Sequence, residues 1–381
     1  MPAEPTATDT PTSTETGLAY YQDRIARAQE LIADAGIDWL LIGPSADLIY
    51  LSDYDAHGSE RLNLLMIPAE GSPSLVVPTL ESFLVGKAGE LAALHPWNDG
   101  ENPIDLVKSI IGAEPGKRIA VGNHLWSAFL LRIQNALPGN AWEEAVPILR
   151  SMRMNKDGIE EQKLFEAARR TDEAWEEFLT SGPISGLTET EAMTRLATIT
   201  EARGVKNVWG ICASGPNSAS PHHHTGDRVI QPGDAVIFDW GGEYEHYFSD
   251  VTRTTFIGEP TEEFVRVYDI VRAANQATLD AVKPGVSLQE LDRAARTLIT
   301  DAGYGPAFLH RVGHGLGMEV HEEPYLVEGN ELPLEVGMVF SDEPGIYLEG
   351  KFGVRIEDSV ICTPEGGKRL NEATRDLVPM S

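Results

Sequence analysis

Apolar and polar residues follow patterns along the chain that predict a mixed α/β protein. An amphipathic helical pattern over residues 20–36 leads into the apolar run Trp39–Ile42. Shorter apolar runs follow at residues 62–67 and 75–77, and Pro and Gly turn signals separate them. The simplest interpretation is a first α/β domain over residues 18–150.

A second domain is predicted over residues 157–381, because its helix and strand signals occur twice. Four helices are indicated by N-cap residues, three of them with capping-box spacing: Asp157 with Glu160, Thr188 with Glu191, Ser287 with Glu290, and Thr261 alone. Each pair of helices precedes an apolar strand in which an acid lies six residues after a glycine, Asp239 after Gly233 and Glu343 after Gly337. Two related halves would place a site at their junction.

Composition narrows the classes of function. The 381 residues include 59 acidic and 30 basic side chains, and the net charge of -29 would repel nucleic acid and an anionic membrane surface. The sequence contains neither a signal-peptide pattern nor an apolar run near the roughly 18 residues of a membrane-spanning helix. Cys212 and Cys362 are expected to be reduced thiols. We therefore expect a cytoplasmic protein with a disordered tail over residues 1–17.

Two pairs of carboxylates carry the candidate chemistry. If the strand ending at Asp239 returns through a turn at residues 241–245, Asp250 faces Asp239 across a hairpin. Glu343 and Glu357 are likewise symmetric about Gly350. Buried carboxylates without partners cost several kcal/mol or become protonated. Each pair therefore predicts a cation between its members.

His314 adds one nitrogen ligand, because its flanking glycines allow a close backbone approach. Four carboxylates and one imidazole suit two divalent ions, and we expect Mn²⁺ before Co²⁺, Fe²⁺ or Zn²⁺. An acid near a hairpin turn is commonly just solvated, so either pair alone would be weak support for a metal site. Both pairs together with His314 favour one. The run His222–His224 is equally compatible with a surface loop.

Seven segments of the second domain together resemble the pita-bread metallopeptidases, which include Xaa-Pro aminopeptidase, prolidase and methionine aminopeptidase. The segments are Ala213–His222 (ASGPNSASPH), Asp239–Gly242 (DWGG), Ser249–Thr254 (SDVTRT), His310–Gly317 (HRVGHGLG), Val320–Pro324 (VHEEP), Glu343–Tyr347 (EPGIY) and Gly353–Asp358 (GVRIED). Residues 18–150 resemble the family's creatinase-like N-terminal domain in size, α/β character and position.

The resemblance implies a pita-bread fold with a pseudo-twofold repeat and a role for each matching residue. The metal ligands would be Asp239, Asp250, His314, Glu343 and Glu357, and Glu343 would also accept a proton. His222 and His321 would contact the scissile carbonyl and the leaving group. His310 would line the proline side of the pocket, and Arg355 would contact the substrate or support a ligand. The expected activity is hydrolysis of the Xaa-Pro bond at the N-terminus of a peptide by a hydroxide that bridges two metal ions. The family also suggests a homodimer in which the N-terminal domain of one copy closes the site of the other.

Three residues depart from the usual family pattern, namely Trp240, His246 and Asp342. They keep open a same-fold hydrolase or lyase that acts on a small non-peptide solute of the ectoine type. A catalytically silent binding module is a further alternative, although no ligand is missing. A dipeptidase would need a cation for the free carboxylate of its substrate, and Arg355 and Arg61 are the candidates; whether the substrate is a dipeptide or a longer peptide stays open.

Overall fold

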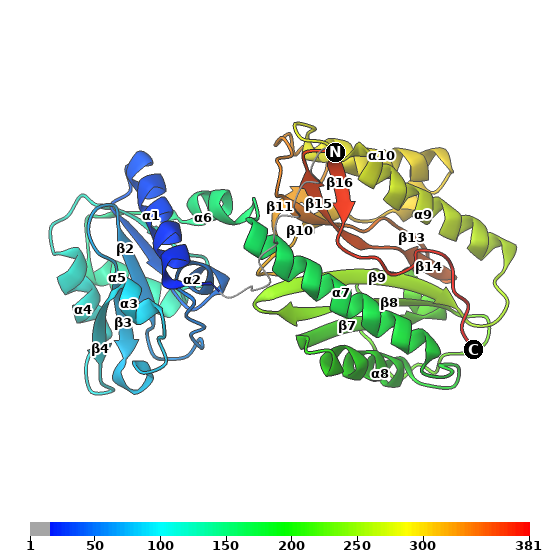
Figure 1. Cartoon of the computed structure of the whole chain (residues 1–381), viewed down its shortest axis with the longest axis horizontal. Helices are drawn as coiled ribbons and strands as arrows, with labels where there is room; N and C mark the ends of the chain where they lie inside the picture. Colours follow the sequence, from blue (N-terminus) through cyan, green and yellow to red (C-terminus); the bar gives the residue numbers. More distant parts are fainter. Residues whose placement is uncertain (1–15) are drawn as a thin grey trace, which may run out of the picture. The chain divides into compact units, whose positions relative to one another are not determined.

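The computed structural model describes residues 16–381, and the chain divides into two compact units at Arg153 and Met154 (Figure 1). Residues 1–15, which make up most of the tail predicted to be disordered, lie outside the described residues. None of the helices within residues 16–381 has both the length and the apolar character needed to cross a bilayer.

The first unit is a six-stranded mixed sheet in the order β4-β3-β2-β1-β5-β6, with helices around it (Figure 1). Its elements are α1 (Leu18–Asp34), β1 (Trp39–Ile42), α2 (Ala46–Ser52), β2 (Leu64–Pro68), β3 (Ser74–Pro78), α3 (Ala88–Leu91), β4 (Ala93–Trp97), α4 (Pro103–Ile111), β5 (Arg118–Val121), α5 (Ser127–Ala136), β6 (Ala141–Glu144) and α6 (Val146–Arg153). Every residue of β2 and β3 is buried, which explains their continuous apolar runs.

The second unit contains two halves, each with two helices and a hairpin. The first half comprises α7 (Gly158–Thr180), α8 (Glu189–Ala202), β7 (Lys206–Ser214), β8 (Ala235–Tyr244) and β9 (Tyr247–Phe256). The second half comprises α9 (Glu262–Ala281), α10 (Leu288–Asp301), β10 (Gly313–Gly315), β11 (Glu322–Leu326), β12 (Val339–Asp342), β13 (Gly345–Leu348), β14 (Phe352–Arg355), β15 (Asp358–Thr363) and β16 (Gly366–Arg369). This is the predicted pita-bread repeat, and with the α/β first unit it confirms the expected fold class.

Helix caps predicted from the sequence mostly form as expected. Asp157 and Thr188 make complete capping boxes at the starts of α7 and α8, and Thr261 accepts a hydrogen bond from the backbone of Phe264 in α9. Ser287 is the N-cap residue of α10, but its side chain makes no capping hydrogen bond. The predicted capping box at Ser287 is therefore wrong, although the helix begins where it was expected.

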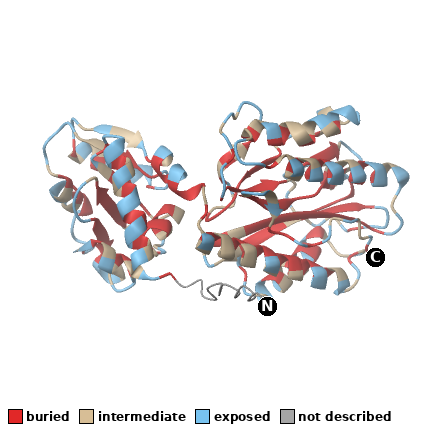
Figure 2. Cartoon of the chain, turned by 45° about the horizontal axis from the view of Figure 1, so that its top comes forward, coloured by how far each residue is buried: buried red, intermediate tan, exposed pale blue. Residues whose placement is uncertain are grey.

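Apolar side chains pack between the helices and strands of each half. The first half buries Trp175 and Phe178 of α7 against Phe238 and Trp240 of β8. A separate cluster packs α9 and α10 against the strands of the second half. Figure 2 shows the same distribution, since the strands of the second unit are largely buried while its helices expose one face. Each half thus has an apolar core of its own.

The register of the first hairpin differs from the prediction. Asp239 lies opposite Thr252, and Asp250 lies opposite Gly241, so the two acids are diagonal neighbours on one face rather than directly opposed. The turn is not at residues 241–245 but at Glu245 and His246, both of which have positive φ. Gly241 lies within the strand instead, where a Cβ atom would come within 2.0 Å of the carbonyl oxygen of Ser249.

Candidate metal centre

The structure brings all nine predicted site residues to one cavity. The cavity has a volume of about 960 Å³ and lies entirely within the second unit. It is lined by the five predicted ligands, Asp239, Asp250, His314, Glu343 and Glu357, and by His222, His310, His321 and Arg355. Because β8, β9 and β10 supply three of the ligands and the others lie between short strands of the second half, rigid strands position the site.

The two acids of the second half occupy matching positions where their strands break. Asp342 of β12 pairs with Asp358 of β15, and Gly345 of β13 pairs with Arg355 of β14, in one common register. Glu343 lies between β12 and β13, and Glu357 takes the corresponding place between β14 and β15. The predicted symmetry about Gly350 is therefore confirmed.

The ligand atoms are close enough to share cations. Three overlapping groups each place three ligand atoms within 4.8 Å of one another: Asp239, Asp250 and Glu357; His314, Glu343 and Glu357; and Asp250, His314 and His321. Asp250, His314 and Glu357 each belong to two groups. This overlap suits adjacent cation positions that share ligands, and it adds His321 to the side chains within reach of a metal.

Two carboxylate oxygens in the centre lack any hydrogen-bond partner among residues 16–381. They are Oδ1 of Asp239 and Oδ1 of Asp250, and both are inaccessible to solvent. Burial, followed by repulsion from neighbouring carboxylates, raises the pKa of Asp250 well above its usual value. Burial also raises the pKa of Glu343 to about 7 and that of Glu357 well above its usual range. Buried, mutually repelling oxygens fit a site for divalent cations.

His314 is oriented as a metal ligand. Its Nδ1 lies 3.1 Å from the carbonyl oxygen of Gly315, so Nδ1 carries the proton and the lone pair of Nε2 is free. Nε2 lies 3.4 Å from Glu343 and 3.6 Å from Asp250. Burial lowers the pKa of His314 to about 3, which keeps the ring in the neutral form that binds metals.

All three guanidinium nitrogens of Arg355 donate hydrogen bonds to the protein. Its Nη2 donates to Asp239 at 2.7 Å, and its Nε donates to the hydroxyl of Thr252 at 3.2 Å. Nη1 donates to the hydroxyl of Tyr347 at 2.8 Å and faces the carbonyl oxygen of Pro221 at 3.4 Å. The guanidinium therefore holds one metal-binding carboxylate in place, and each of its three nitrogens donates to the protein.

His310 is held by the same network. Its Nδ1 donates to the carbonyl oxygen of Arg311 at 2.8 Å, and its Nε2 accepts from the hydroxyl of Tyr347 at 2.8 Å. Burial lowers the pKa of His310 to about 4, so the ring is neutral. With both nitrogens bound to the protein, His310 offers the cavity an uncharged ring.

The loop that carries His222 is anchored by a buried carboxylate, Glu189. Its side chain accepts hydrogen bonds from the backbone and hydroxyl of Ser214, from the amide of Asn217 and from Nε2 of His223. These bonds lower the pKa of Glu189 despite its burial. Glu189 therefore fixes both sides of the loop on which His222 lies.

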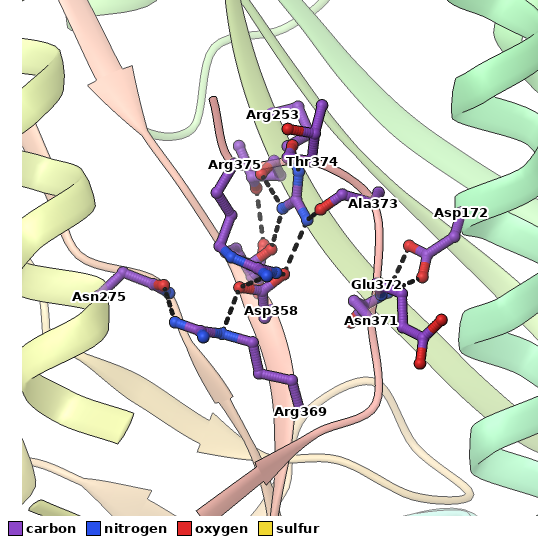
Figure 3. Close-up of polar contacts among 12 residues, drawn as sticks. Asp172, Arg253, Asn275, Asp358, Arg369, Asn371, Glu372, Ala373, Thr374 and Arg375 are labelled. Carbon is purple, nitrogen blue, oxygen red and sulfur yellow. Dashed lines mark hydrogen bonds and ion pairs between the residues drawn. The ribbon is translucent and has the colours of Figure 1, made fainter. Parts of the chain in front are cut away.

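A buried ion cluster supports the ligand strands from behind. Asp358, the residue after Glu357, is contacted by Arg253, Arg369 and Arg375 (Figure 3). Arg253 also donates to the carbonyl oxygens of Glu357 at 2.6 Å and Ala373 at 2.7 Å. The cluster thus joins β9, β15 and the C-terminal segment beside two of the ligands.

Comparison with protein families shows the family to which the chain belongs. The description "Metallopeptidase family M24" matches residues 162–364, and "Creatinase/Prolidase N-terminal domain" matches residues 24–155. The chain belongs to metallopeptidase family M24. It is an enzyme of the hydrolase class, and family M24 implies divalent metal ions, for which the three ligand groups are the candidates.

Relatives of this M24 peptidase share nearly its whole length. The "Probable dipeptidase PepE" of Mycobacterium tuberculosis is 39% identical over 94% of this chain and 96% of its own. The crystal structure of dipeptidase PepE from Mycobacterium ulcerans has a TM-score of 0.91 at 39% identity and covers 96% of this chain and 99% of its own. Prolidase from Thermococcus sibiricus has a TM-score of 0.90 at 36% identity and covers 94% of this chain and 99% of its own.

The three departures from the family pattern lie away from the cavity lining of this M24 peptidase. Trp240 is fully buried and contacts Trp175, with 5.1 Å between the ring centroids. His246 is in the β8–β9 turn and contacts Glu243. Asp342 is fully buried and is not among the residues that line the cavity.

Sequence reasoning assigned no role to Thr252, Tyr347 or Glu189. Thr252 lies two positions after Asp250 on the same face of β9, so strand alternation could have indicated it. Tyr347 and Glu189 act through contacts with segments distant in the sequence. Local spacing carries no signal for such contacts.

Proposed function

We propose that this M24 peptidase hydrolyses the Xaa-Pro bond at the N-terminus of small peptides and uses two divalent cations. The observation that carries the proposal is that one buried carboxylate oxygen on each of Asp239 and Asp250 has no hydrogen-bond partner among the described residues. Both acids belong to the three-residue ligand groups, which overlap at Asp250, Glu357 and His314. Named prolidase and dipeptidase relatives over nearly the full length support the substrate class.

The five side chains Asp239, Asp250, His314, Glu343 and Glu357 would hold the cations. When bound, divalent cations in such a site polarise a peptide carbonyl and lower the pKa of water. Glu343 is placed to accept the proton of the attacking water, because its side chain is 17% exposed, whereas Asp250 is 4% exposed and Asp239, at 15%, is already paired with Arg355. The ligand that faces the cavity most openly is thus a base within reach of substrate.

His321 and His222 would complete the reaction from the open side of the cavity. Both side chains are exposed at its lining, and the ring of His321 lies 4.0 Å from that of His314. His321 would donate a hydrogen bond to the developing oxyanion, and His222 would contact the substrate near the cleaved bond. The acidic centre would attract the ammonium group of a substrate N-terminus, which favours an exopeptidase.

The neutral ring of His310 supports a proline at the second position. Its nitrogens are bound to Tyr347 and Arg311, so the ring can offer a substrate only van der Waals contact. The pyrrolidine ring of proline has no hydrogen-bonding group, and such contact therefore suits it.

Three narrower properties belong to the same proposal. An oxygen-rich set with one imidazole favours Mn²⁺ over Co²⁺, Fe²⁺ or Zn²⁺. Exposed Leu80, Phe83 and Leu84 on the first unit support a homodimer, because adjacent exposed apolar side chains commonly mark interfaces. The two free cysteines, both buried, support a cytoplasmic location.

A non-peptide solute is less well supported as the substrate. The alternative depended on Trp240, His246 and Asp342, and none of these residues lines the cavity. Their chemistry therefore cannot select a small solute directly.

A panel of substrates tests the proposal. Ala-Pro, Ala-Pro-Ala, Met-Ala peptides and ectoine-type solutes are compared in Mn²⁺ and in Co²⁺. We expect turnover of the Xaa-Pro compounds and loss of that turnover in Asp250→Asn. Turnover of solutes only, or Xaa-Pro cleavage that survives Asp250→Asn, would refute it.

A further inference from the structure

The cavity is lined by two guanidinium groups, and only one of them is committed to the protein. The donors of Arg355 are directed at Asp239, Thr252, Tyr347 and Pro221. Arg311 also lines the cavity, yet its guanidinium has no hydrogen bond or ion pair with any residue between 16 and 381. Arg311 is therefore a cation whose donors are available to a ligand.

An aromatic ring supports the guanidinium of Arg311. Its central carbon lies 4.3 Å from the centre of the Tyr325 ring. An arginine over an aromatic face keeps its N–H groups free at the edges, where they can bind a carboxylate with two parallel hydrogen bonds. The stacking therefore restricts the side chain and leaves its binding edge open.

This supporting ring lies beside the metal centre. Tyr325 of β11 pairs directly with His314 of β10, so the two side chains share a face of the sheet. Arg311 and the candidate ligand His314 also line the same cavity, together with His321. A substrate that reaches the metal ligands would thus share a cavity with Arg311.

We infer that Arg311 binds the free carboxylate of a dipeptide substrate and makes this M24 peptidase prefer dipeptides over longer peptides. The inference rests on the proposed Xaa-Pro hydrolysis. In an Xaa-Pro dipeptide, the carboxylate is attached to the residue that His310 contacts, and His310 and Arg311 are adjacent in the chain. Neither earlier candidate fits this role as well, because all three guanidinium nitrogens of Arg355 donate to the protein and Arg61 is paired with Asp99 and Glu60 in the first unit.

The test compares Ala-Pro with Ala-Pro amide, which differs only in lacking the carboxylate. For the manganese-loaded wild type we expect a higher kcat/KM with Ala-Pro. Arg311→Met should lower the ratio of the two values by about 100-fold, mainly through the KM for Ala-Pro, and Arg311→Lys should recover part of the ratio. Tyr325→Leu should lower the ratio less than Arg311→Met does, whereas Tyr325→Phe keeps the ring and the ratio.

A matched control and a binding measurement separate the possible failures. Arg293→Met removes an arginine that pairs with Glu290 and Glu328 at the surface, and the ratio should not change. Calorimetry measures the affinity for the reduced-bond analogue of Ala-Pro, which cannot be hydrolysed, and for the amide of that analogue. Wild type should bind the analogue with the free carboxylate more tightly, and Arg311→Met should lose this preference. The inference would be overturned if the ratio of the two kcat/KM values were unchanged in Arg311→Met, or if Arg61→Met lowered that ratio instead. Absence of any Xaa-Pro turnover in wild type would overturn the proposed function, while the calorimetry would still test Arg311.

Discussion

Thr252 donates a hydrogen bond of 2.6 Å to Glu357, and this contact joins the two halves of the catalytic unit at their ligands. Thr252 lies on β9, two residues after Asp250, and its backbone also forms a bridge with Glu357. The same hydroxyl accepts a hydrogen bond from Arg355. One buried threonine therefore orients a carboxylate from the other half and a guanidinium that holds Asp239.

Replacing Thr252 with valine should weaken metal binding. The change keeps the shape of the side chain but removes the donor to Glu357, and loss of a hydrogen bond that orients a ligand typically costs about 10- to 100-fold in affinity. Manganese titration by calorimetry measures the effect. Thr255→Val is the matched control, because Thr255 bonds to the carbonyl oxygen of Val378 rather than to a ligand. Equal affinities in the two variants would contradict the orienting role.

Removing Arg253 should destabilise the catalytic unit strongly. Arg253→Met takes a 2% exposed cation from Asp358, whose side chain is fully buried, and breaking a buried pair typically costs about 3–5 kcal/mol. Arg375→Met removes a 25% exposed arginine from the same carboxylate and should cost about 1 kcal/mol or less. Urea unfolding of both variants makes the comparison. Similar losses would show that burial does not set the strength of these contacts.

Asp172 should make stability depend on pH. Burial raises its pKa to about 6 in the folded protein, from 3.8. The contribution of Asp172 to stability is therefore complete below about pH 4 and is lost as the pH rises through 6, because the folded state then opposes ionisation. Relative to Asp172→Asn, wild type should lose about 2 kcal/mol in its free energy of unfolding between pH 4 and 7. Urea unfolding at both values measures this, and a constant difference would be the contrary result.

Much of the site could be predicted because its residues lie in short segments with regular spacing. The symmetry of Glu343 and Glu357 about Gly350 survives in the structure because the strands on either side of the break keep one register. Asp239 also follows an apolar run, residues 235–238, that is plain in the sequence. Periodicity and acid spacing were sufficient for these features.

The first hairpin shows where such reasoning fails. Gly241 and Gly242 resemble a turn, but they lie within β8, where a Cβ atom on either would collide with neighbouring backbone. The true turn is formed by Glu245 and His246, which adopt positive φ without being glycine. The register of the hairpin depends on packing between segments that are distant in the sequence, and local residue patterns do not show such packing.

The hydrogen-bond partners of Arg355 were also not predictable from local spacing. The family resemblance implied that Arg355 contacts the substrate or supports a ligand, and its donors are directed at Asp239, Tyr347 and Pro221, which come from three other segments. Arg311, next to His310 in the sequence, drew no attention because its significance depends on Tyr325 beneath it and on the absence of a protein partner among residues 16–381. Such roles become visible only when the cavity is assembled.

The stoichiometry of manganese binding tests the central claim most directly. Mass spectrometry of the metal content, after incubation with Mn²⁺ and removal of the excess, is expected to find two ions per chain in wild type. Asp250→Asn should lose at least one of them, because Asp250 belongs to two of the three ligand groups. No stoichiometric uptake by wild type, or two ions retained by folded Asp250→Asn, would contradict the assignment of this cavity as a dinuclear centre.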